Sequence, residues 1–192
     1  MTYLVAGVLL WSLVHLMKSV TPGLRASIQG AIGEGPHKGL AALLLLTAVG
    51  LMIYGWRTTP AEFVYDPPVW GRHLNMLLMI FAIYLIGVAQ GKSRVKQWIR
   101  HPMLNGFLIW TIGHLLANGD NKSLVLFGGL GLWALISIIT VSRHEGKWVK
   151  PPEVATPGRE VLSVVIALVL YAILFATHQY FAGVALIGSQ AA

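Results

Sequence analysis

The chain has 192 residues, of which 56% are hydrophobic and only 11% are charged. Soluble domains carry about 25% charged residues, so the composition predicts one integral membrane domain over residues 1–192. The sequence contains no cysteine. Disulfides, iron–sulfur clusters, thiolate-bound haem and cysteine zinc sites are therefore excluded. The net charge of +7 lies mostly in loops between apolar segments. This distribution is typical of membrane orientation and argues against nucleic acid as a partner.

Six segments are apolar enough to cross a bilayer as helices of about 20 residues. In chain order they are residues 2–20, 38–56, 68–90, 102–117, 123–141 and 161–180. Pro68 and Pro102 suit the first turn of a helix, where no backbone N–H is needed. The predicted fold class is therefore all-α, a polytopic membrane bundle of about six transmembrane helices.

Two of the loops between these spans also have helical character. In residues 21–32 a cap residue and a proline precede Leu24, Ile28 and Ile32, which share one helical face and suit a helix lying on the membrane surface. Residues 93–98 show a weaker form of the same pattern. We expect short cytoplasmic surface helices in both loops, and an irregular solvated loop is the alternative for each.

The basic residues are divided unequally between the two sides of the predicted bundle. The loops after the first, third and fifth spans hold 11 of the 14 lysines and arginines, and the other side holds only Arg57, Arg72 and Lys122. Basic loops stay in the cytoplasm. The pattern predicts a multi-pass protein with both termini outside the cytoplasm.

Two histidines lie inside predicted spans. His114 lies in the fourth span, and His15 lies in the first span with Ser12 and Ser19 on the same helical face. An ionisable residue inside a membrane is costly and indicates a functional site. The structural alternative is that each imidazole bonds a neighbouring hydroxyl or carbonyl and packs two helices together. The stripe formed by Ser12, His15 and Ser19 should face the bundle.

The polar residues after the fourth span have two interpretations. Asn118 and Asp120 suit the caps of the helices on either side, and Asn118 lies on the same face as His114. In the functional interpretation, this segment instead orients the His114 side chain.

Spacing limits which histidines can share a ligand. His101 and His114 are 13 positions apart on one helix, about 20 Å along its axis, so they cannot bind the same ion. A two-histidine site must therefore use different helices. Counting along the spans allows either His15 or His73 as the partner of His114. The other three histidines lie in loops or near a span end, where we expect structural roles: His37, His144 and His178.

Four sequence elements resemble the NnrU family of bacterial membrane proteins. They are Trp11-Ser12-Leu13-Val14-His15 with the Pro22-Gly23-Leu24-Arg25 that follows, Pro67-Pro68-Val69-Trp70-Gly71-Arg72-His73-Leu74, Arg100-His101-Pro102-Met103, and Gly113-His114-Leu115-Leu116-Ala117-Asn118-Gly119-Asp120. The family takes its name from a link to nitrite and nitric oxide reduction. It is similar to plant zeta-carotene isomerase, a haem b protein that isomerises a polyene.

The resemblance implies a haem b cofactor. By its pattern the iron ligands fall on His15 and His114, and Thr111 replaces a cysteine of the isomerase. Haem propionates need cations, for which Arg25, Arg72 and Arg100 are candidates. His73 and His101 complete the set of candidate cofactor residues.

The resemblance also implies where the protein acts and on what. The implied location is the bacterial inner membrane, with both termini periplasmic. The implied activity is of redox or isomerase type, either on an apolar polyene or in a role linked to nitrite and nitric oxide reduction. The expected partners are the lipid bilayer and either the polyene substrate or respiratory and denitrification proteins.

Two other functions remain open. Arg100-His101-Pro102 also resembles the cofactor-binding helix start of isoprenylcysteine carboxyl methyltransferases, which bind S-adenosylmethionine, although Leu104 stands where those enzymes have a tyrosine. The third possibility is a non-enzymatic membrane assembly factor in which the histidines are structural.

Overall fold

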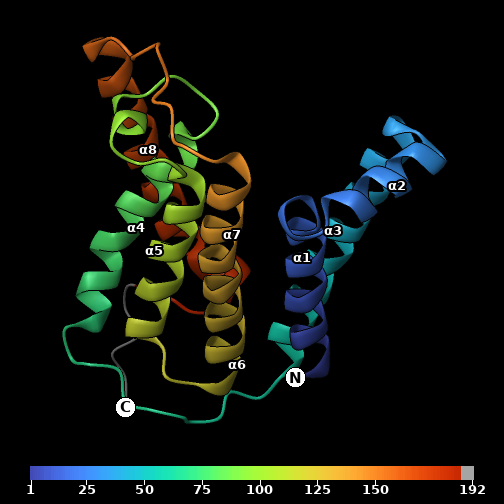
Figure 1. Ribbon diagram of the computed structural model, residues 1–192. Helices are drawn as coiled ribbons and strands as arrows, with labels where there is room; N and C mark the ends of the chain where they lie inside the picture. Colours follow the sequence, from blue (N-terminus) through green and yellow to red (C-terminus); the bar gives the residue numbers. More distant parts are fainter. Residues whose placement is uncertain (187–192) are drawn as a thin grey trace.

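The computed structural model describes residues 1–186, and every regular element in that range is helical (Figure 1). The elements are α1 (Thr2–Val20), α2 (Pro22–Ile32), α3 (Glu34–Thr58), α4 (Gly71–Val88), η1 (Arg94–Gln97), α5 (Pro102–Ala117), α6 (Asn121–Ser123), η2 (Leu124–Gly128), α7 (Gly129–Glu145) and α8 (Pro157–Ala182). Within the described range, strand-like pairing is limited to a single bridge between Phe63 and Asp120.

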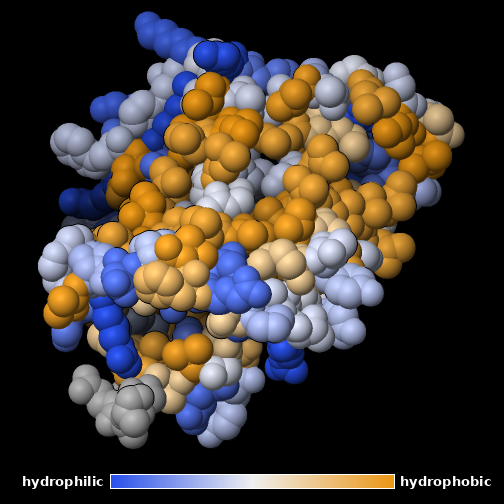
Figure 2. Space-filling model, turned by 90° about the horizontal axis from the view of Figure 1, so that it is seen from below, coloured by the Kyte–Doolittle hydropathy of each residue, from blue (hydrophilic) through white to orange (hydrophobic). Residues whose placement is uncertain are grey.

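The predicted all-α membrane bundle is confirmed. Five helical segments are long and apolar enough to cross a membrane, and one of them is the continuous run Asn121–Glu145, formed by α6, η2 and α7. The shorter α5 is also apolar and packs against both α4 and α7. Large apolar side chains lie on the outside, as lipid contact requires; Leu46, for example, is 70% exposed. Figure 2 shows broad apolar patches on the surface.

Several span boundaries differ from the prediction by a few residues. The third span begins at Gly71, because Pro68 lies in a turn in which its carbonyl accepts a hydrogen bond from the Gly71 N–H. The expectation that Pro68 occupies the first turn of a helix was therefore wrong, whereas Pro102 does occupy it. The second span starts earlier than expected, at Glu34.

Both predicted loop helices are present. Residues 22–32 form α2, and the second loop forms the short 3₁₀ helix η1. The start of η1 is anchored to α8, because the Glu160 carboxylate accepts hydrogen bonds from the Ser93 hydroxyl and the Arg94 backbone N–H.

The helices form two groups that lie side by side (Figure 1). The hairpin of α1 and α3 stands beside the group of α4, α5, α7 and α8, and α1 packs against α7 where the groups meet. Glycines allow the closest helix approaches, as is common in membrane bundles. Gly55 of α3 lies against the Leu4 backbone of α1, and Gly113 of α5 lies against Asn75 of α4.

The two ends of the bundle differ in composition. We call the end that carries α2, η1 and residues 146–156 the basic end, because most lysines and arginines lie there. At the opposite end the start of α1 meets the end of α3, since the N-terminal ammonium donates a hydrogen bond to the Thr59 hydroxyl. The end of α8 is also there, because the Trp56 indole donates a hydrogen bond to the Ala182 carbonyl.

Substituting Gly55 is expected to destabilise the hairpin of α1 and α3. An added Cβ would overlap the Leu4 backbone nitrogen, and overpacking of this kind typically costs about 1–3 kcal/mol. We expect Gly55→Ala to lower the free energy of unfolding in mixed detergent micelles by this amount. Gly50→Ala is the matched control, because it lies on the same helix and its added Cβ would meet no atom within 4 Å. Equal stability of the two variants would contradict the packing described here.

Candidate cofactor site

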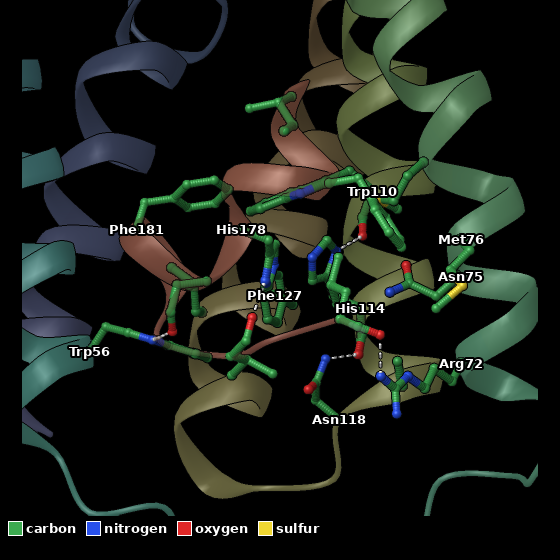
Figure 3. Close-up of a pocket in the computed structure, with 18 of the residues that line it drawn as sticks. Trp56, Arg72, Asn75, Met76, Trp110, His114, Asn118, Phe127, His178 and Phe181 are labelled. Carbon is green, nitrogen blue, oxygen red and sulfur yellow. Dashed lines mark hydrogen bonds between the residues drawn. The ribbon is translucent and has the colours of Figure 1, made fainter. Parts of the chain in front are cut away.

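A cavity of about 540 Å³ lies between α3, α4, α5, η2 and α8, near the opposite end of the bundle (Figure 3). Pockets that hold cofactors or other small molecules occupy about 300–1,000 Å³ and are mostly apolar with a few polar groups. This cavity follows that pattern. Its polar lining includes His114, His178, Arg57, Arg72 and Asn75, set among methionine, leucine and aromatic side chains.

His114 projects into the cavity from the last turn of α5. Its Nδ1 lies 2.8 Å from the Trp110 carbonyl oxygen, one turn earlier on the same helix. A carbonyl can only accept a hydrogen bond, so Nδ1 carries the proton and Nε2 carries the lone pair. Within the described residues, Nε2 has no hydrogen-bond partner. This is the arrangement of a metal-ligating histidine, in which a backbone carbonyl fixes the tautomer and leaves the other nitrogen free.

Aromatic rings fix the plane of the His114 imidazole. The Phe127 ring stacks on it, with centroids 4.4 Å apart and planes 22° apart, and the Trp110 ring lies at 5.1 Å. Phe127 belongs to η2, a π-helical segment inside the fifth span. Such segments are rare and often occur at functional sites.

Two arginines and an asparagine provide further polar groups to the cavity. The Arg72 guanidinium donates a 2.7 Å hydrogen bond to the Leu186 carbonyl. Arg57 lines the cavity from the last turn of α3 and makes no hydrogen bond or ion pair with the described residues. The Asn75 Oδ1 atom is buried and likewise has no partner there. Asn75 lies beside His114 in Figure 3, so the cavity wall holds an unused polar group.

The loop between α3 and α4 is held against the end of α5, beside the cavity. The Tyr65 hydroxyl donates hydrogen bonds to the carbonyls of Leu115 and Asn118, and the Gly119 carbonyl accepts from the Tyr65 backbone N–H. An added Cβ at Gly119 would overlap the Tyr65 carbonyl oxygen, so only glycine fits there.

The polar segment after α5 has mainly a capping role. Asp120 caps α6 by accepting a hydrogen bond from the Ser123 backbone N–H. The Asn118 side-chain amide donates to the His114 backbone carbonyl, not to the imidazole. The capping interpretation therefore describes both residues, and Asn118 reaches His114 only through its backbone.

His15 lies outside this cavity. Its Nδ1 is 2.9 Å from the Trp11 carbonyl oxygen, and its ring packs on Trp133 at a centroid distance of 5.1 Å. The predicted polar stripe does face the bundle, because the Ser19 hydroxyl lies 3.0 Å from the Thr140 hydroxyl of α7. The structure thus gives His15 and His114 the same local geometry but places them in different surroundings.

The remaining candidate residues lie away from the cavity, with the exception of Arg72. His73 is exposed at the start of α4 and does not line the cavity. Arg25 lies on α2, at the basic end. His101 caps α5 at that same end, and its Nε2 is 2.9 Å from the Ser142 hydroxyl of α7. Arg100 pairs with Glu145 and lines a separate depression of about 440 Å³ together with Lys96 and Lys147.

Two cavity residues were not predicted as site residues from the sequence. His178 was expected to have a structural role because it lies near the end of a span, and Arg57 was counted only for orientation. A histidine near the end of a membrane span is common and has a low energetic cost, so the position of His178 in the sequence does not indicate a functional role. Only the packing of the end of α8 against α3 and α4 shows that both side chains line one cavity.

The fold and the cavity define a polytopic α-helical membrane protein with a histidine-containing pocket between its helices. A profile described as NnrU protein matches residues 3–186, which is nearly the whole chain. The chain therefore belongs to the NnrU family. No curated protein and no solved structure shows a significant match to it.

Protonation of His101 is expected to weaken the contact between α5 and α7. Burial lowers the pKa of His101, Glu145 opposes this effect and Arg100 adds to it. The folded protein therefore binds the proton less readily than the unfolded chain, whose imidazole pKa is near 6.5. We expect the free energy of unfolding to be highest above this pH and to decrease as the pH falls below about 6.5. Unfolding in detergent should lose part of this pH dependence in His101→Gln and keep it in the exposed control His144→Gln. Identical pH profiles for the two variants would contradict the role of His101.

Proposed function

We propose that this chain is a haem b protein of the bacterial inner membrane, with both termini periplasmic, in which His114 is an iron ligand. The observation that carries the proposal is the free Nε2 of His114 inside an apolar cavity. In an apolar setting the neutral imidazole is favoured over the charged form, and the neutral form is the one that binds iron. The Trp110 carbonyl already holds the ring in the required tautomer.

The rest of the cavity lining suits the same cofactor. Haem is a large apolar ring with two carboxylates. The cavity has a volume of about 540 Å³, and its lining combines apolar side chains with Arg57 and Arg72. Each guanidinium can bind a propionate through two parallel hydrogen bonds. Arg57 has no other partner within residues 1–186, which leaves its five N–H donors available. When bound, haem supplies an iron centre that exchanges single electrons.

The substrate that fits this site best is an apolar molecule dissolved in the bilayer. Three cavity residues, one on α3 and two on α8, are also about half-exposed: Ile53 at 51%, Leu174 at 44% and Phe181 at 51%. The cavity therefore communicates with the lipid between α3 and α8. This access route favours isomerisation of a polyene by electron exchange. The alternative, a role in nitrite or nitric oxide reduction, would use the same iron site.

The proposal is tested by the visible spectrum of the detergent-purified protein after expression with ample haem. We expect a Soret band in the unchanged protein. His114→Ala should reduce the retained haem at least about tenfold, because loss of even a group that supports a ligand costs 10–100-fold in affinity. His144→Ala, at an exposed position near the end of α7, is the matched control and should retain its haem.

Other outcomes of this test favour the alternatives. A colourless protein would reject the haem proposal. If that colourless protein binds S-adenosylmethionine and Arg100→Ala abolishes this binding, the methyltransferase hypothesis is favoured. The binding site would then be the depression at the basic end that Arg100 lines. A protein with neither property would favour a non-enzymatic assembly role.

A further inference from the structure

A second imidazole projects into the cavity from α8. The His178 Nδ1 atom lies 2.8 Å from the Val184 carbonyl oxygen. By the argument used for His114, this carbonyl fixes the proton on Nδ1 and leaves the Nε2 lone pair without a partner among the described residues. Both rings line the same cavity, His114 from α5 and His178 from α8 (Figure 3). The cavity therefore contains two neutral imidazoles in the same tautomer.

Both histidines lie in the part of their helices that is nearer to the opposite end of the bundle. Both α5 and α8 run from the basic end to the opposite end. His114 is three residues before the last residue of α5, Ala117, and His178 is four residues before the last residue of α8, Ala182. At 1.5 Å per residue, their distances from the helix ends differ by only about 1.5 Å. Within residues 1–186, α8 packs along α4 and makes no extensive contact with α5. The cavity thus lies between the two helices that carry these histidines.

The alternative partners do not share this position. His15 is 13 residues after Thr2, the first residue of α1, and α1 begins at the opposite end. It therefore lies about 20 Å up the axis of α1. Its ring packs on Trp133 and does not line the cavity. His73 is close enough to the opposite end, but its side chain is exposed outside the cavity.

Contacts at the end of α8 hold His178 in place. Gly183 adopts a left-handed conformation with φ of 74°, which turns the chain back so that the Val184 carbonyl reaches His178. The Arg72 guanidinium binds the next part of this segment at Leu186, and the Trp56 indole binds Ala182. The imidazole is thus fixed from α3, α4 and its own helix before any ligand binds.

We propose that His178 and His114 are the two side chains that would hold the haem iron. This inference rests on the proposed haem function and assigns the second ligand to α8 instead of α1. The iron then joins α5 to α8 across a cavity that no direct helix packing fills. Two imidazole ligands give a six-coordinate iron, and removing one leaves an open coordination position.

The inference is tested by the spin state of the haem in the purified full chain. We expect low-spin spectra for the unchanged protein and for His15→Ala, and high-spin spectra for His178→Ala. Added imidazole should return His178→Ala to the low-spin state by occupying the vacated position. His178→Met keeps a possible ligand, and a thioether in place of an imidazole should raise the reduction potential.

The outcomes separate this inference from the proposed function. A colourless unchanged protein rejects the haem function itself. A coloured protein in which His178→Ala stays low-spin, or in which His15→Ala becomes high-spin and is restored by imidazole, rejects His178 as the ligand and leaves the haem function standing. Should His178→Ala lose its haem, it is incubated with haem and imidazole and then freed of unbound haem. Low-spin haem that stays with the protein supports the inference, and protein that retains no haem contradicts it.

Discussion

A polar side chain inside a membrane must satisfy its hydrogen-bonding groups within the protein, and His114 satisfies only one of its two nitrogens. The Trp110 carbonyl takes the Nδ1 proton, and Phe127 and Trp110 hold the ring plane. In water the remaining nitrogen would bond the solvent. In an apolar cavity an unused lone pair is costly, since a buried polar group without a partner loses its solvation. Within residues 1–186 Nε2 is therefore available to a ligand, and the rest of the cavity limits which ligand would fit.

The helices, their order and the basic end could be predicted from the sequence, because apolar length and charge distribution have direct physical causes in a bilayer. The orientation of the stripe of Ser12, His15 and Ser19 followed from helical periodicity in the same way. Pro68 was misplaced because a proline suits a turn before a helix as well as its first turn.

The cavity could not be predicted in this way, because it depends on contacts between residues far apart in the chain. Trp56 meets Ala182, and Arg72 meets Leu186, so the end of α8 is held against α3 and α4. These contacts bring His178 and Arg57 to the site. The π-helical turn of η2 that carries Phe127 likewise has no clear sequence signal.

The two buried histidines are connected through aromatic packing even though they do not share a cavity. His15 contacts Trp133, which contacts Phe107 at 5.6 Å, and Phe107 contacts Trp110 at 6.1 Å, next to His114. Among residues 1–186, the buried indole N–H groups of Trp11 and Trp133 have no hydrogen-bond partner, so these two side chains are held by packing of their rings. A change at His15 can therefore loosen the His114 site from a distance. Loss of haem alone does not show ligation by His15, and a property of the iron itself is needed.

The position of the iron tests this account most directly. Anomalous scattering at the iron absorption edge, measured on crystals of the haem-loaded protein, locates the metal without any assumption about ligands. The account predicts a single peak in the cavity between α5 and α8, within bonding distance of the His114 Nε2 atom. A peak beside His15, on the far side of Trp133 from the cavity, would contradict it.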